Sequence, residues 1–129
     1  MQIEVYFQQL RELIDACPIV QSHSLTYDKR GTHEGFVRGE ITFVDGSVLH
    51  LREFVDVETT VERLLYVYQY MDSAQRLRFR YDNTGHHKRL NLPTYPHHQH
   101  EGAEERIVPS YAPDLTAVLS EVEAAVDLP

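Results

Sequence analysis

Five of the eight histidines in this chain of 129 residues fall within one short window. They stand in two groups, "GHH" (85–87) and "PHHQH" (96–100). The unperturbed pKa of histidine, about 6.5, lets the side chain donate and accept protons near neutral pH. Imidazole is also a common metal ligand. The window therefore suggests three alternatives: acid–base catalysis, a metal site, or a solvated loop that is rich in histidine.

A metal site would need several imidazoles on one side of the chain. Neighbouring residues of an extended segment point to opposite sides, so His97 and His98 do not ligate one ion easily, whereas His98 and His100 can. Asp82 or the earlier histidine pair would supply further ligands. No HExxH-type signature accompanies these residues. Metal binding is therefore the less favoured chemistry, and no metal or cofactor is expected.

The basic residues are unevenly distributed along the chain. Residues 76–100 hold five basic residues and one acid, a local charge of +4, whereas the remaining residues hold seven basic and nineteen acidic groups, or −12. Phosphate contacts need an excess of Lys and Arg, so the net charge of −8 argues against a general nucleic-acid binder. An anion would be bound locally, by the segment that contains Arg76, Arg78, Arg80, Lys88 and Arg89.

Histidine, tyrosine and arginine together are sufficient to cleave RNA. Attack by the RNA's own 2′-hydroxyl needs a base, an acid and positive charge near the phosphorane, and no metal. The run "RYDN" (80–83) leads from the basic residues into the histidine window. A structural role is the simpler explanation for any one of these residues, for example Tyr81 in the core. The crowding of both histidine groups beside the basic segment favours catalysis for the cluster.

Hydrophobic periodicity predicts a helix at each end of the chain. Over residues 2–16, apolar residues recur every three or four positions until Pro18 ends the pattern. A second helix begins at Pro113 and Asp114 and continues to about residue 126. The predicted apolar stripes are Tyr6, Leu10, Leu13 and Cys17 in the first helix, and Leu115, Val118, Leu119, Val122 and Val126 in the second.

Alternating residues between the helices predict a strand over 19–28 and hairpins over 36–56 and 63–83. Matching the apolar faces of the first hairpin requires an odd-numbered turn, such as a three-residue turn with a glycine bulge. Glu53 then lies on the apolar side, where its carboxylate is either partnered or escapes to water at the strand end. The second hairpin sets Leu77, Phe79 and Tyr81 opposite the row Tyr66, Tyr68 and Tyr70, with the arginines on the other face.

Roughly thirty residues after Asn83 show little periodicity and hold all five clustered histidines. The expected fold is α+β: an N-terminal helix, an antiparallel sheet of about five strands built from hairpins, a long His-rich loop and a C-terminal amphipathic helix. The length predicts one domain, residues 1–129. The single Cys17 excludes a disulfide framework, and no apolar run or signal peptide points to a membrane, so a cytoplasmic protein is expected.

The chain resembles the TumE-like family, which comprises small bacterial and archaeal proteins regarded as toxins of type II toxin–antitoxin pairs. The similarity covers residues 36–126 and is most specific at "RYDN…HH" and "PHHQH". It is carried by four runs in chain order: "GSVLHLREFVD" (46–56), "YVYQYMDSAQRLRFRYDNTGHH" (66–87), "LPTYPHHQH" (92–100) and "VPSYAPDL" (108–115).

The resemblance implies a growth-inhibiting toxin that acts on RNA or the translation machinery. Its expected partner is a cognate antitoxin, a small helix-turn-helix DNA-binding protein encoded beside it. The family has been likened to RelE-type ribonucleases, which favours a metal-independent ribonuclease. Two alternatives stay open: a non-catalytic inhibitory module that binds through the His-rich loop, and a metal-dependent hydrolase or nuclease. A homodimer also stays open.

In the ribonuclease hypothesis the histidines move protons, an acid orients a histidine and fixes its tautomer, and arginines hold phosphate. The candidate catalytic residues are His87, His98, His100, Arg80, Tyr81, Asp82 and Glu53. The candidate substrate-binding residues are Arg76, Arg78, Asn83, His86, Lys88, Arg89 and His97.

Overall fold

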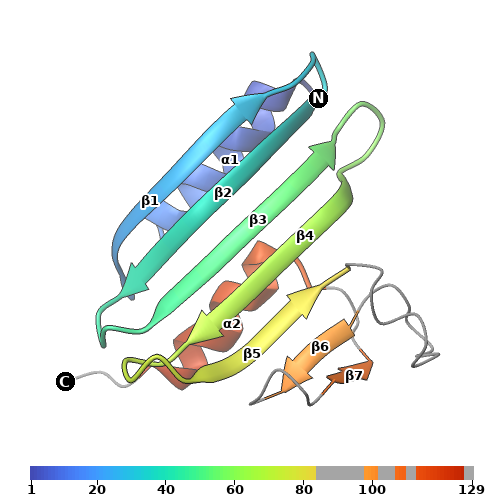
Figure 1. Cartoon of the computed structure of the whole chain (residues 1–129). Helices are drawn as coiled ribbons and strands as arrows, with labels where there is room; N and C mark the ends of the chain where they lie inside the picture. Colours follow the sequence, from blue (N-terminus) through green and yellow to red (C-terminus); the bar gives the residue numbers. More distant parts are fainter. Residues whose placement is uncertain (84–97, 102–106, 110–112, 127–129) are drawn as a thin grey trace.

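The computed structural model describes residues 1–83, 98–101, 107–109 and 113–126. Within these residues the strands form one antiparallel sheet in the order of the chain, with both helices on one side of it (Figure 1). The α+β class is thereby confirmed, and two short strands extend the sheet into the segment expected to be a loop. The elements are α1 (Ile3–Asp15), β1 (Val20–Lys29), β2 (Glu34–Phe43), β3 (Val48–Asp56), β4 (Glu62–Met71), β5 (Leu77–Asp82), β6 (His98–Glu101), β7 (Ile107–Pro109) and α2 (Leu115–Ala125).

The β2–β3 hairpin has the predicted odd-numbered turn. The Phe43 amide donates to the Ser47 carbonyl at 2.9 Å across a three-residue loop in which Gly46 has φ +85°. Glycine adopts this left-handed conformation without a steric cost. The resulting register sets Val37 opposite Glu53, on the apolar side of the hairpin. Glu53 is buried there, so the partnered alternative is the one that the structure shows.

The β4–β5 hairpin has the register that segregates apolar from charged residues. Tyr68 lies opposite Tyr81, and Tyr70 lies opposite Phe79. A bulge after Tyr70 then places Leu77 opposite the following residue of β4 instead of a tyrosine. The predicted separation of the tyrosines from the arginines is confirmed for Arg80.

Each helix packs an apolar stripe on the sheet. The α2 stripe is buried as predicted, and the Asp114 carboxylate caps the helix by accepting a hydrogen bond from the Ala117 amide at 3.0 Å. In α1, Tyr6 and Leu10 are buried, but Leu13 is only half-buried because the buried side of the helix runs through Ile3, Phe7 and Ile14. Cys17, predicted to continue the stripe, is half-buried and lies beyond the end of the helix. Neither of these described helices has the length and apolar character that crossing a membrane requires.

Side chains of the strands alternate between two faces of the sheet. The helix face is the one that α1 and α2 cover, and it includes Glu53 and Tyr81, which reach side chains of these helices. The far face is the opposite one, and it includes Arg38, Arg52 and Arg80. This division decides which candidate residues can act together.

Candidate functional site

The β5–β6 ladder brings together two motifs that are separated in the sequence. Asp82 lies directly opposite His98, and Arg80 lies directly opposite His100. The two-residue step between the histidines therefore matches the two-residue step between the acid and the arginine. The ladder therefore places part of "RYDN" beside part of "PHHQH", at the level of the backbone.

Arg80 and Asp82 form a partly buried ion pair on the far face. The Arg80 Nε lies 2.9 Å from Asp82 Oδ2, and its Nη1 donates to Gln69 Oε1 at 3.2 Å. The Asp82 side chain is fully buried, whereas that of Arg80 retains 24 % of its accessible surface. A charge-assisted hydrogen bond of this geometry fixes the plane of the guanidinium. The ladder thus presents an oriented cation next to two histidine positions.

Tyr81 and Asn83 hold β5 against its neighbours. The Tyr81 hydroxyl donates to Glu121 Oε2 of α2 at 2.8 Å, so this side chain lies on the helix face, away from Arg80. Asn83 Oδ1 accepts from the Tyr66 amide at 2.8 Å, and its Nδ2 donates to the Leu64 carbonyl at 3.3 Å. These contacts anchor the end of the strand that carries Arg80 and Asp82.

The other candidate residues divide between exposed and undescribed positions. Arg76 is exposed in the β4–β5 turn, where its Nε lies 3.0 Å from Asp72 Oδ2. Arg78 is exposed at the bulge of β5, where the pairing with β4 skips it. The side chains of His98 and His100 lie outside the described residues, and so do His86, His87, Lys88, Arg89 and His97.

Glu53 belongs to a second group of polar residues, buried on the helix face. Its two carboxyl oxygens accept hydrogen bonds from the hydroxyls of Tyr6 and Tyr68. Burial raises the pKa of Glu53, and the two tyrosine hydrogen bonds and the charge of Arg63 only partly oppose this effect. The structure therefore separates the two candidate acids, Glu53 and Asp82, by the thickness of the sheet.

Arg63 is the member of this group that the sequence did not reveal. Its Nη1 donates to the Tyr68 hydroxyl at 3.2 Å and to the Pro113 carbonyl at 2.8 Å, and its guanidinium lies 4.3 Å from the centre of the Tyr66 ring. Simple alternation from Tyr66 would place Arg63 on the far face. A register shift between Phe54 and the next residue of β3 brings it to the helix face instead.

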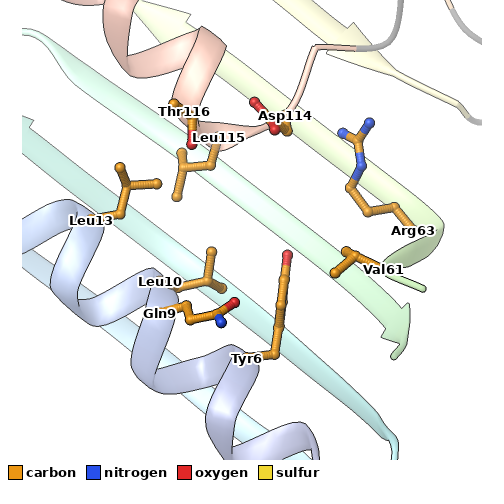
Figure 2. Close-up of a pocket in the computed structure, with 9 residues that line it drawn as sticks. All are labelled: Tyr6, Gln9, Leu10, Leu13, Val61, Arg63, Asp114, Leu115 and Thr116. Carbon is orange, nitrogen blue, oxygen red and sulfur yellow. The ribbon is translucent and has the colours of Figure 1, made fainter. Parts of the chain in front are cut away.

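A cleft of about 370 Å³ opens between α1 and the start of α2, next to this group (Figure 2). Tyr6 projects from α1 into the cleft, and Arg63 and Asp114 lie on the side formed by β4 and α2 (Figure 2). Burial is the main cause of a raised pKa for Tyr6, so its hydroxyl remains a neutral donor. None of the described histidines lines this cleft. Its remaining walls are Gln9, Leu10, Leu13, Val61, Leu115 and Thr116.

Metal ligation has no support among the residues that the structure describes. They contain no group of three or more His, Cys, Asp or Glu side chains that could hold an ion. The clustered imidazoles lie outside these residues, so the choice between proton transfer and metal binding by histidine stays a prediction.

Together the fold and the β5–β6 ladder define a class of protein: a single-sheet α+β domain in which a basic strand is paired with a histidine-rich one. A family model described as Toxin TumE matches residues 10–127. The chain therefore belongs to the toxin TumE family and is a toxin of a toxin–antitoxin system, with a cognate antitoxin as its partner. No curated protein and no solved structure matches the chain.

Proposed function

We propose that this toxin is a metal-independent ribonuclease whose active site forms on the β5–β6 ladder. The observation that carries the proposal is the register, which sets His98 opposite Asp82 and His100 opposite Arg80. In the proposed reaction one imidazole removes the proton of the RNA 2′-hydroxyl, and the other protonates the departing 5′-oxygen. The Arg80 guanidinium stabilises the negative charge of the phosphorane.

Asp82 is the positioning residue of this site. Its buried carboxylate forms an ion pair with the Arg80 guanidinium, and it lies opposite His98 in the ladder. A carboxylate in this place can fix both the plane of the cation and the tautomer of an imidazole. Glu53 accepts hydrogen bonds from two tyrosines on the helix face, so we assign the role of orienting a histidine to Asp82.

The remaining candidates extend the site along the basic segment. Arg78 and Arg76 follow Arg80 toward the β4–β5 turn, where an RNA backbone that leaves the ladder would meet them. Asn83 keeps the end of β5 in place for the residues that follow it. In the proposal the cognate antitoxin keeps this surface inactive until it is removed.

The test is expression of the toxin without its antitoxin. Wild type and the variants His98→Ala and His100→Ala are compared for growth and for the integrity of total RNA. The matched control is His23→Ala, an exposed histidine of β1 that lies 3.4 Å from Asp15 of α1 and is remote from the ladder. Wild type and the control should arrest growth and degrade RNA, and the two ladder variants should do neither. Equal growth and equal RNA integrity for wild type and His98→Ala would sink the proposal.

Purified components distinguish the rival functions. Attack by the 2′-hydroxyl leaves a 2′,3′-cyclic phosphate and a 5′-hydroxyl, and this cleavage should survive a chelator. Activity that a chelator abolishes and Mg²⁺ or Zn²⁺ restores would assign the histidines to a metal-dependent nuclease. Growth arrest by a protein that binds its target without any turnover would assign them to an inhibitory module.

A further inference from the structure

The register of the sheet arranges the far face in rows that cross the strands. In two adjacent rows each residue lies directly opposite the next, and both rows end at the histidine positions of the proposed active site. The distance from β3 to β6 is three inter-strand steps, or ~14 Å. The rows are Thr26, Arg38, Arg52, Val67, Asp82 and His98, and then Ser24, Glu40, His50, Gln69, Arg80 and His100.

The first row contains two arginines that face each other. Arg38 and Arg52 are cross-strand neighbours, and both are exposed. Among the described residues, neither forms an ion pair with a carboxylate. Like charges directly opposite each other destabilise an antiparallel pair. The stability of the sheet therefore gives no reason for this pair, whereas a bound polyanion would.

Two phenylalanines lie beside the arginines on the same face. Phe36 and Phe54 are cross-strand partners with ring centres 6.2 Å apart, and the Arg52 guanidinium lies 5.9 Å from the Phe36 ring. Both rings are half-buried and so keep part of their surface accessible. Aromatic rings next to cations are the means by which sheet surfaces bind single-stranded nucleic acid: bases stack on the rings and phosphates meet the cations.

An open hollow of about 450 Å³ lies over these rows, lined in part by Arg38, Arg52 and His50 and by the hydroxyl residues Ser24 and Thr26. Hydroxyl and imidazole groups can hydrogen-bond to ribose and to phosphate. Of the described residues that line the hollow, Glu40 alone has a carboxylate, and its Oε2 lies 3.4 Å from His50 Nδ1. With His50 neutral the charged groups of the hollow sum to +1, in contrast to the −8 of the whole chain.

We propose that the far face of β1 to β4 binds single-stranded RNA and leads it to the β5–β6 ladder. Arg38 and Arg52 contact phosphates, and Phe36 and Phe54 stack on bases. The bases of a duplex would be hidden from these rings, so the proposed substrate class is unpaired RNA. This proposal rests on the proposed ribonuclease function, for which it names the substrate class and the route to the site of cleavage.

The test measures binding apart from cleavage. Fluorescence anisotropy follows a labelled single-stranded RNA of about 12 nucleotides, within the usual site size for such surfaces, on full-length protein that carries His98→Ala. Adding Arg38→Ala and Arg52→Ala together should weaken binding about tenfold or more at low salt. The slope of log Kd against log salt should fall by about 1.4, because each phosphate contact to a single strand contributes about 0.7. The matched control Arg11→Ala removes an exposed arginine of α1, on the opposite side of the sheet, and should leave Kd unchanged.

A second variant separates stacking from charge. Phe54→Leu keeps an apolar side chain but removes the ring, and it should weaken binding about fivefold with the salt slope unchanged. Circular dichroism and urea unfolding verify that each variant is folded.

Several outcomes would overturn the proposal. They are equal binding by the double-arginine variant and its parent, equal weakening by Arg11→Ala, and equal affinity for duplex and single-stranded probes. Loss of antitoxin co-purification in the double-arginine variant, with RNA binding intact, would also overturn it and would make the far face a protein interface. If wild type binds RNA through Arg38 and Arg52 but leaves it intact, the binding surface stands and the ribonuclease proposal falls. If the protein cleaves RNA and the cleavage does not depend on Arg38 and Arg52, the ribonuclease proposal stands and the proposed binding surface falls.

Discussion

The helix face and the far face of this sheet differ in the charge that surrounds them. On the helix side, α1, α2 and the Asp114 cap carry six acidic residues and one basic residue, Arg11. The central part of the far face has more arginines than acids, and the remaining acids of its β1–β3 strands gather at the end near the β1–β2 turn. The central residues are Arg38, Arg52 and Arg80 against Glu40 and Asp82, and the acids at the end are Asp28, Glu34 and Asp56.

Among the described residues each face also buries one carboxylate, and the partners differ. Glu53 on the helix face accepts from the neutral hydroxyls of Tyr6 and Tyr68, whereas Asp82 on the far face is paired with the guanidinium of Arg80. Neutral donors satisfy a buried acid without requiring it to be charged. A guanidinium partner stabilises a carboxyl group only in its charged form. We infer that Glu53 on the helix face contributes to stability, whereas Asp82 on the far face positions the Arg80 guanidinium.

The largest effect that this comparison predicts is on stability. Glu53→Ala should lower the free energy of unfolding by about 3–5 kcal/mol, because it leaves two buried hydroxyls without an acceptor and opens a cavity. The control is Glu40→Ala, an exposed acid of the far face, which should change the value by less than about 0.5 kcal/mol. Urea unfolding near neutral pH measures both. Similar values for the two variants would show that the buried hydroxyl network does not stabilise the fold.

The second prediction concerns pH. Burial raises the pKa of Glu53 above its ordinary value of 4.5, so the folded state holds this proton more tightly than the unfolded state does. The resulting stabilisation is complete below about pH 4.5 and is lost as pH rises through the folded-state pKa. Over that interval wild type should lose up to about 1.4 kcal/mol per pH unit relative to Glu53→Gln, which has no proton to release. Paired urea titrations of the two proteins at a series of pH values test this. If the difference in free energy of unfolding between the two proteins does not change with pH, the pKa of Glu53 is the same in the folded and unfolded states.

The sequence was sufficient wherever a local pattern determines the outcome. The position of Glu53 follows from matching apolar faces across one short turn, since a slip of one residue would expose the whole apolar set. The start of α2 follows from Asp114, because few side chains can accept from the free amides of a first turn. The register of β4 and β5 follows from the same segregation of tyrosines from arginines.

What the sequence could not predict depends on contacts between distant segments. Strands β6 and β7 are three or four residues long, and "HQHE" in β6 has no apolar alternation to mark it. The position of Arg63 depends on a bulge in the β3–β4 pairing, which shifts the alternation and has no signature in composition. The pairing of Arg38 with Arg52 was implicit in the predicted first hairpin. The rows that continue from it to the ladder also depend on the β3–β4 and β5–β6 registers, and these become visible only in the assembled sheet.

The smallest predicted effect tests the far face alone. Arg38→Gln keeps most of the side chain and removes one of two facing charges, so the free energy of unfolding should rise by about 0.2–1 kcal/mol. The gain should disappear at about 1 M salt, where charges are screened within about 3 Å. Arg30→Gln removes an exposed arginine whose Nε lies 2.9 Å from Asp28 Oδ2, and it should bring no gain. Urea unfolding at low and high salt compares the two variants. A gain for Arg38→Gln together with weaker RNA binding would mean that the sheet tolerates this repulsion for the sake of a ligand. A loss of stability for Arg38→Gln would instead assign Arg38 to the stability of the sheet, and the arginine pair would then no longer distinguish the two faces.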